Sequence, residues 1–266
     1  MGDTGQGTSN GGGGGTTRAT PSNATVNLSQ MQALAQKSGS QADHDLALLL
    51  IDATSPMKVI VDSNQQDTDT QRFINSTGIA DRKPEVVKDE QALENKKFMG
   101  ETIGDYLYHT DSPQGSIRDA KTFGDQYQNG RMYNSSGYYG DGSYFSDSTE
   151  GSWRYGYNNP NAYQIKGMLN SKARIIKDTD LEKRIKSFKR SHPTAARVIN
   201  KMSTGYGATE GTMSVYAQLF GFNVITHDLG WRKEKYYTIT DRSVTTVVKK
   251  GIHDPDQYTS NNWKYQ

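Results

Sequence analysis

The stretch GYYGDGSYFSDSTEGSWRYG, residues 137 to 156, decides how the rest of the chain is interpreted. It combines five glycines and five serines or threonines with several aromatic side chains. Glycine lets a backbone approach a ligand closely, and aromatic rings offer flat faces for stacking. Because ordinary surface turns favour the same residue types, the order of the residues must decide between a turn and a site.

That order resembles a segment of the ADP-ribosyltransferases of the diphtheria-toxin and poly(ADP-ribose)-polymerase type. The family has a Gly-x-Gly-x-Tyr-Phe-Ala/Ser segment whose Tyr belongs to a His-Tyr-Glu triad, and here Gly142 and Tyr144 take these places. The family also has an amide-binding Ser eight residues beyond this Tyr and a stacking Tyr eleven beyond it, and Ser152 and Tyr155 stand there. The resemblance implies that these residues bind nicotinamide, which the two tyrosines would sandwich.

The upstream histidine of the triad has a counterpart in Leu107-Tyr108-His109, 35 residues before Tyr144. The resemblance implies that His109 hydrogen-bonds ribose hydroxyls, a role that a neutral imidazole can perform. Thr110 follows where the family has Gly, and the family uses the backbone of this position to hold the carboxamide. Threonine keeps both the N–H and the C=O group.

The third member of the triad is left open between two residues. In the polymerases the Glu precedes a strand of the form Tyr-Ile-Val-Tyr-Asp, and here Tyr236 precedes YTITD at 237–241. Glu234 lies two positions earlier, on the same face if the strand extends that far. We weight Tyr236 slightly higher. By the resemblance, a non-acidic residue in this slot implies transfer of single ADP-ribose units or none, so poly(ADP-ribose) synthesis is not expected.

Composition bounds the remaining chemistry. The 266 residues carry a net charge of only +2 and are 33% hydrophobic, which predicts one compact domain with tails and no polybasic nucleic-acid binder. Without cysteine there is no thiolate site, and the scattered histidines predict no metal site; His192 and His227 are expected at surface or strand-end positions. The longest apolar run, 46–51, is far shorter than the ~20 residues of a membrane span, so no membrane partner is expected.

Local patterns divide the chain into three parts. Residues 1–26 are Gly/Ser/Thr-rich and predict a flexible tail. Residues 27–100 predict a mostly helical region, and residues 101–266 the catalytic domain. Helices are expected at 27–39, with Ser29 as N-cap and Gly39 as stop, and at 41–53, 67–75, 86–98, 180–202 and 211–221. Strands are expected at 57–63, 104–110 and 222–228, two strands or one long bent one at 235–250, and two within 162–177 broken at 170–171.

Helices that come first, with strands interspersed and late, indicate an α+β fold. The resemblance implies two facing antiparallel sheets that clamp NAD, with helices around them and a helical N-terminal extension. Basic residues in 180–202 suit the later part of a helix, so a nucleic-acid acceptor is less favoured than a protein.

The expected function is that of a mono-ADP-ribosyltransferase, with NAD as co-substrate and an unknown host protein as acceptor. The chain also resembles the entry into ADP-ribosyltransferase domains of bacteriophage structural proteins, which implies a phage-encoded protein in the host cytoplasm or the virion, with a secreted toxin as another setting. The alternative is a degenerate transferase fold kept as an NAD-binding or non-catalytic virion or interaction module. Labelled NAD and host lysate would distinguish the two.

Overall fold

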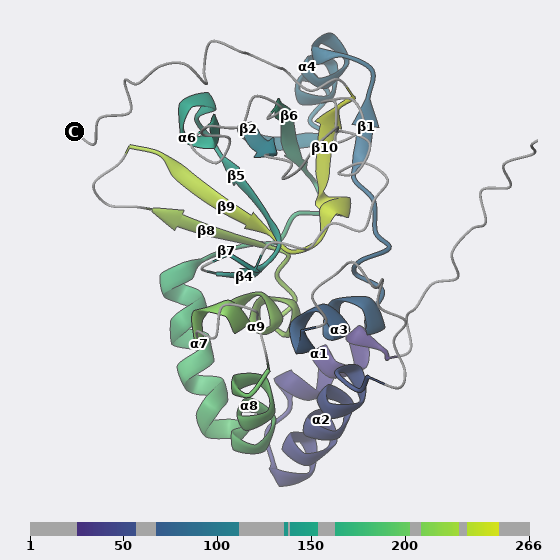
Figure 1. The fold of residues 1–266 in the computed structure, drawn as a ribbon, viewed down its shortest axis with the longest axis vertical. Helices are drawn as coiled ribbons and strands as arrows, with labels where there is room; N and C mark the ends of the chain where they lie inside the picture. Colours follow the sequence, from purple (N-terminus) through teal and green to yellow (C-terminus); the bar gives the residue numbers. More distant parts are fainter. Residues whose placement is uncertain are drawn as a thin grey trace, which may run out of the picture.

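The computed structural model describes residues 26–56, 68–111, 136–137, 139–153, 163–202, 209–228 and 233–249. These residues form a layer of helices beneath a twisted sheet, with a short helix at each side of the sheet (Figure 1). The α+β class expected from the sequence is confirmed. Tyr155, the expected strand at 57–63 and the tail at 1–25 lie outside the described residues.

Eight α-helices occur in these ranges. They are α1 (Leu28–Gln36), α2 (Ser40–Ala53), α3 (Asp69–Ser76), α4 (Glu90–Phe98), α6 (Thr149–Trp153), α7 (Asp178–Ser191), α8 (Pro193–Asn200) and α9 (Met213–Leu219). The N-cap of α1 is Asn27 and not Ser29, because the Asn27 side chain accepts a hydrogen bond from the Gln30 N–H group (3.2 Å). Gly39, at φ 119°, stands at the start of α2 instead of ending α1.

The prediction of a single long helix at 180–202 is wrong. The chain forms α7 and α8 instead, with His192 between them and Pro193 as the first residue of α8. Proline lacks an N–H group and clashes with the preceding turn, so it begins a helix more readily than it continues one. The new N-terminus is capped from another helix, because the Asp43 carboxylate of α2 accepts hydrogen bonds from the N–H groups of Thr194 (3.0 Å) and Ala195 (2.8 Å).

The main sheet has eight strands in the order β1-β10-β6-β2-β5-β9-β8-β7. They are β1 (Glu85–Val87), β2 (Thr102–Asp111), β5 (Ser143–Ser146), β6 (Tyr163–Asn170), β7 (Ile175–Lys177), β8 (Val224–Asp228), β9 (Lys235–Ile239) and β10 (Thr245–Val248), while β3 (Ser136–Gly137) and β4 (Gly140–Asp141) form a separate pair. The β1/β10 and β7/β8 pairs are parallel. The structure thus has one continuous mixed sheet where two facing antiparallel sheets were expected.

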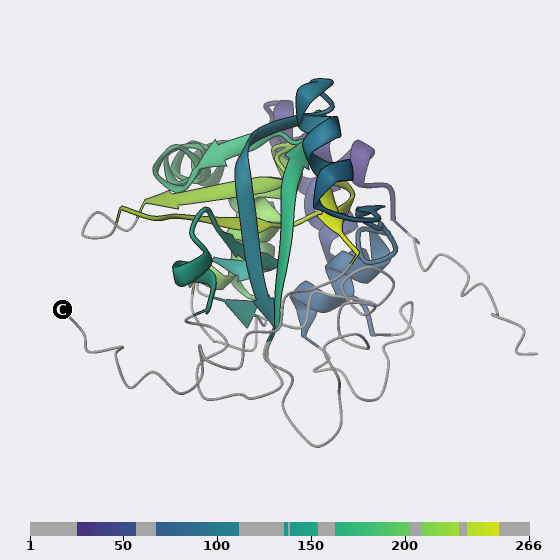
Figure 2. The same ribbon diagram turned by 90° about the horizontal axis from the view of Figure 1, so that it is seen from above.

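This sheet has a narrow seam between β2 and β5. The two strands share a single register pair, Tyr108 with Ser146, whereas β2 follows β6 from Thr102 to Asp111. Figure 2 shows the consequence, because β2 and β6 run steeply across the direction of β8 and β9. The two halves of the sheet therefore diverge at the seam.

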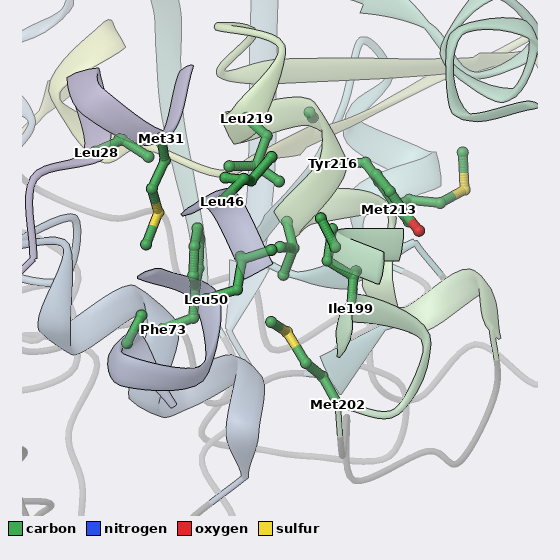
Figure 3. Packing of buried hydrophobic residues seen from close by; sticks show 14 of the residues in the cluster. Leu28, Met31, Leu46, Leu50, Phe73, Ile199, Met202, Met213, Tyr216 and Leu219 are labelled. Atoms are coloured by element: carbon green, nitrogen blue, oxygen red, sulfur yellow. The ribbon is translucent and has the colours of Figure 1, made fainter. Parts of the chain in front are cut away.

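One hydrophobic core joins the first helices of the chain to later ones. Leu28, Met31, Leu46, Leu50 and Phe73 from α1 to α3 pack with residues of α8 and α9 and their ends (Figure 3). The later residues labelled there are Ile199, Met202, Met213, Tyr216 and Leu219. A second cluster, which includes Leu107, Phe145 and Ile165, is formed mainly by side chains of the sheet strands themselves. The helices of residues 27–100 thus share their core with the region that follows.

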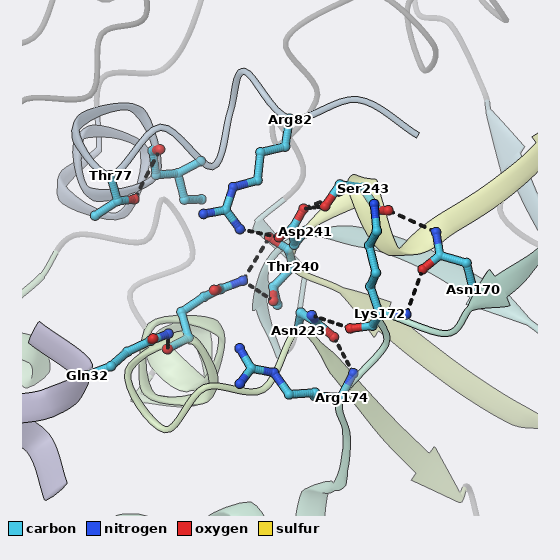
Figure 4. Close-up of polar contacts among 12 residues, drawn as sticks. Gln32, Thr77, Arg82, Asn170, Lys172, Arg174, Asn223, Thr240, Asp241 and Ser243 are labelled. Atoms are coloured by element: carbon cyan, nitrogen blue, oxygen red, sulfur yellow. Dashed lines mark hydrogen bonds and ion pairs between the residues drawn. The ribbon is translucent and has the colours of Figure 1, made fainter. Parts of the chain in front are cut away.

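Polar contacts connect this helical layer to the sheet (Figure 4). The Gln32 side chain of α1 donates to the Gln218 carbonyl of α9 (2.7 Å), and the Gln218 side chain donates to the Thr240 carbonyl after β9 (3.1 Å). Arg82 forms an ion pair with Asp241, which has only 3% of its surface exposed. These contacts fix the end of β9 relative to the helices.

Candidate active site

Three neighbouring strands of the sheet carry the residues expected to form the triad. His109 lies near the end of β2, Tyr144 lies in β5, and Tyr236 lies in β9 with Glu234 just before it. The sheet order β2-β5-β9 places these strands side by side. Residues that are widely separated in the sequence are thus brought to one part of the sheet, at the seam.

His109 contacts Tyr144 directly. Its Nδ1 atom lies 2.6 Å from the Tyr144 carbonyl oxygen. Since a carbonyl oxygen only accepts, Nδ1 carries a proton and is the donor. The imidazole also packs against the Phe145 ring, with 5.0 Å between centroids. Both the tautomer and the orientation of His109 are therefore set by β5.

Thr110 contacts Ser152, the residue expected to hold the nicotinamide amide. Their hydroxyl oxygens lie 2.7 Å apart, and both side chains are buried. Ser152 belongs to α6, whose start is held by hydrogen bonds from the Gly151 N–H group to the Ser148 hydroxyl and from the Ser148 N–H group to the Ser146 hydroxyl. Thr110, which stands where the family has Gly, is thus hydrogen-bonded to Ser152, which matches the family pattern.

Glu234 and Tyr236 are adjacent in space. The Tyr236 hydroxyl donates to Glu234 Oε2 at 3.0 Å, although β9 begins at Lys235 and so does not extend to Glu234. Gly151 makes room for the carboxylate, because a Cβ atom there would lie 2.9 Å from Glu234 Oε2 and 2.6 Å from the Ser146 hydroxyl. The two candidates for the third position of the triad form one pair.

Gly142 has a packing role that its place in the motif does not reveal. A Cβ atom there would lie 2.8 Å from Thr238 Cγ2 and 3.0 Å from the Ile239 carbonyl oxygen. Because such contacts are too short for a real Cβ, glycine allows β5 to pair closely with β9. The packing of β5 against β9 therefore explains the glycine at position 142 without any role in ligand binding.

The Tyr144 hydroxyl is anchored to the turn before β5. It donates to the Gly140 carbonyl (2.6 Å) and accepts from the Tyr139 N–H group (3.2 Å). Gly140 itself lies against α9, where a Cβ would lie 2.4 Å from the Ser214 hydroxyl. The Tyr144 ring is partly exposed, and its outer end is fixed.

The expected site residues divide between the two faces of the sheet. His109 packs with Phe145 on the face of the second core cluster. Strand alternation places Thr110 on the opposite face, together with Tyr144, Ser146 and Tyr236. His109 reaches Tyr144 through the backbone of β5, and the hydroxyl and carboxylate groups gather on the other face.

His227 is a residue near this site that the sequence did not single out. It stands at the end of β8 as expected, but only 1% of it is exposed. Its ring stacks on Tyr139 with 3.4 Å between centroids, and its Nε2 atom lies 2.9 Å from the Thr238 hydroxyl. Burial lowers the pKa of His227 to about 3, so the ring is neutral at pH 7. The alternation of Ile225 and His227 along β8 was the available signal for burial.

His192 also corrects an expectation, because it is 2% exposed and not a surface residue. It lies between α7 and α8 with its ring stacked on Phe188. Within the described ranges, no group of three His, Cys, Asp or Glu side chains could hold a metal ion, and no helix is long and apolar enough to cross a membrane.

Comparison with known proteins adds no relative. No protein-family model matches the chain, and neither a curated protein nor a solved structure is significantly similar to it.

Proposed function

We propose that this protein is a mono-ADP-ribosyltransferase that binds NAD at the seam and transfers ADP-ribose to a protein acceptor. One observation carries the proposal: His109, Tyr144 and Tyr236 lie on three adjacent strands, with Glu234 hydrogen-bonded to Tyr236 and His109 Nδ1 2.6 Å from the Tyr144 carbonyl. A phage-encoded enzyme acting in its host belongs to the proposal through the sequence resemblance alone.

The seam supplies groups of the right kind for a nicotinamide nucleotide. The His109 ring lies on the opposite face of the sheet from the Tyr144 ring, so its contact with a ribose hydroxyl belongs to the proposal through the sequence resemblance alone. Ser152 and the backbone of Thr110 hold the carboxamide. The Tyr144 ring stacks on the nicotinamide, which contributes about 1 kcal/mol beyond area burial.

The reaction breaks the bond between nicotinamide and C1 of the ribose. The bonding electrons leave on the ring nitrogen, which makes nicotinamide neutral and builds positive charge on the ribose. The Glu234 carboxylate, held by the Tyr236 hydroxyl at 3.0 Å, stabilises that charge. An acceptor side chain then gives its lone pair to C1 and loses its proton to the carboxylate or to water.

Nicotinamide release by three variants tests this arrangement. We expect His109→Ala and Glu234→Gln each to lose on the order of a hundredfold in rate, about 3 kcal/mol for a contact made in the transition state. Tyr236→Phe removes only the hydroxyl that holds the carboxylate, and we expect a loss of about tenfold. Glu182→Gln, exposed on α7, is the matched control. Full activity in all three variants would show that the site is misplaced.

The product is the second readout. Incubation with labelled NAD and a protein lysate should give bands that carry single ADP-ribose units, since Tyr236 stands in the sequence position where the polymerases have the Glu. Digestion of the labelled protein checks this: it should release one ADP-ribose unit per modified site and no longer chains. Chains of linked units would contradict the mono-transfer proposal.

One observation favours the alternative, a non-catalytic NAD-binding or interaction module. The Ser152 hydroxyl is already hydrogen-bonded to Thr110, where the family has glycine. Titration of Thr110→Gly with NAD separates the two functions. A transferase keeps its affinity within a few-fold, because Ser152 turns to the ligand in either case. A module whose pocket is closed by Thr110 shows no NAD binding as the native chain and gains it in the variant.

A further inference from the structure

A closed ring of contacts joins four residues: Tyr144, Tyr139, His227 and Thr238. The Tyr144 hydroxyl accepts from the Tyr139 N–H group (3.2 Å), and the Tyr139 ring stacks on His227 at 3.4 Å and 18°. His227 Nε2 lies 2.9 Å from the Thr238 hydroxyl, and Thr238 is the register partner of Tyr144 in β9. The imidazole on β8 thus contacts β9 and the turn before β5, and each of these contacts Tyr144.

The His227 imidazole lowers the stability of the fold through one of its ring nitrogens. Within the described residues, His227 Nδ1 is buried without a hydrogen bond, and the nearest carboxylate oxygen, Asp178 Oδ2, is 3.7 Å away. An unpaired buried polar atom lowers stability. Phenylalanine would avoid that cost and keep the stacked ring but lose the contact with Thr238. Glutamine would keep a polar contact and lose the stacked ring. Of these three side chains, histidine alone keeps both contacts.

We infer that His227 is a positioning residue for Tyr144, acting through Tyr139 on the hydroxyl end of the ring and through Thr238 on its strand. The inference rests on the proposed function in one respect: the Tyr144 ring is the surface on which nicotinamide stacks. It adds a residue from β8, outside the sequence motif, to the binding of the same nucleotide.

Steady-state kinetics of the full chain test the role. Stacking is present in the bound ground state and in the transition state alike, so a loosened Tyr144 raises KM and leaves kcat nearly unchanged. We expect KM for NAD to rise about fivefold to tenfold in His227→Phe and His227→Gln, with kcat within twofold. Thr238→Val, which keeps the side-chain shape, should shift KM in the same direction. His44→Gln, exposed on α2, is the control. Unchanged KM in folded His227 variants would overturn the inference.

A measurement without NAD separates this inference from the proposed function. In protein with labelled tyrosine rings, the Tyr144 signal, assigned with Tyr144→Phe among the 16 tyrosines, reports the order of that ring. We expect this signal to shift or broaden in His227→Gln and to stay in place in His44→Gln. If the native chain neither binds nor cleaves NAD, the proposed function fails while this result still decides the positioning role. An unmoved Tyr144 signal would refute it.

Discussion

The helical layer and the sheet each bury a histidine, and the surroundings of the two rings differ. In the helical layer, both nitrogens of His192 have partners, the Ser191 hydroxyl at 2.9 Å and the Leu34 carbonyl at 3.2 Å. In the sheet, His227 has a partner only at Nε2, and its Nδ1 atom is buried unpaired in the described part of the chain. The first histidine is a satisfied part of a core. The second, His227, lies beside the proposed site, and its Nδ1 atom lacks a hydrogen bond among the described residues.

The difference teaches where this fold is organised for stability and where for chemistry. The helical layer gathers apolar side chains from six helices into one cluster and caps α8 with a buried aspartate. The seam of the sheet is held by hydroxyl and backbone contacts, and its strands share one register pair. We therefore expect substitutions in the helices to change unfolding, and substitutions at the seam to change ligand binding and turnover.

The largest effect should come from a cavity in the helical core. Leu46→Ala deletes a fully buried side chain of α2, and such deletions cost about 2–5 kcal/mol. Chemical denaturation measures this loss as a lower midpoint. Leu48→Ala, on the same helix with 52% of Leu48 exposed, is the matched control and should stay within about 0.5 kcal/mol. Equal losses in both variants would break the contrast between the two layers.

A steric change at the seam should act mainly on turnover. In Gly151→Ala, the new Cβ meets the Ser146 hydroxyl and the Glu234 carboxylate, so the carboxylate must move. We expect nicotinamide release to fall by about tenfold to a hundredfold, about 1.4–3 kcal/mol in activation free energy. Thr149→Ala, exposed in the same helix, controls for α6. A variant with native rates would show that Glu234 does not act from its observed position.

As pH falls, folding stability should be lost first through a residue of the sheet, His227, and only at lower pH through the helices. The pKa of His227 is about 3 in the folded protein and ordinarily 6.5, so the unfolded chain takes up a proton first as pH falls below about 6.5. We expect this residue to remove about 2 kcal/mol of stability between pH 7 and pH 5. Denaturation at both pH values measures the loss, and His227→Phe should show a smaller one. An identical pH dependence in the variant would contradict the neutral buried ring.

The smallest effect concerns the cap of α8. Burial raises the pKa of Asp43, but hydrogen bonds from the Ala195 and Thr194 N–H groups outweigh it, so the pKa lies below its ordinary value. This contribution is present above the unfolded pKa of 3.8 and is lost as pH falls through the folded value. Asp43→Ala should cost about 1 kcal/mol at pH 7. Asp45→Ala on the same helix should cost less, and denaturation at pH 7 compares them.

Local sequence signals predicted those elements whose stability is local. The apolar pattern of α2 and the Thr68 cap of α3 were sufficient for both helices. The expected helix at 86–98 began too early, because Val86 and Val87 belong to β1, which pairs with β10. That pairing joins residues about 160 apart and leaves no signature in a short window.

The candidate site shows the same limit. Fixed offsets within one stretch led to Tyr144 and Ser152, and the upstream pattern led to His109, which contacts Tyr144. His227 could not be found in this way, because its neighbours Tyr139 and Thr238 come from the turn before β5 and from β9. Spacing along the chain predicts residues of one motif, whereas a supporting residue is defined by contacts across the sheet.

The shared helical core has a consequence for synthesis. The apolar faces of α1 and α2 pack against each other and α3, and the rest of their cluster comes from α7, α8 and α9, well over a hundred residues later. A chain that emerges from the ribosome N-terminus first carries the remaining part of these faces uncovered until α7, α8 and α9 have been translated. Contacts so distant in sequence slow folding, because a long loop must close before they form. We therefore expect the nascent protein to depend on chaperones, and a chain that stops before α8 to aggregate.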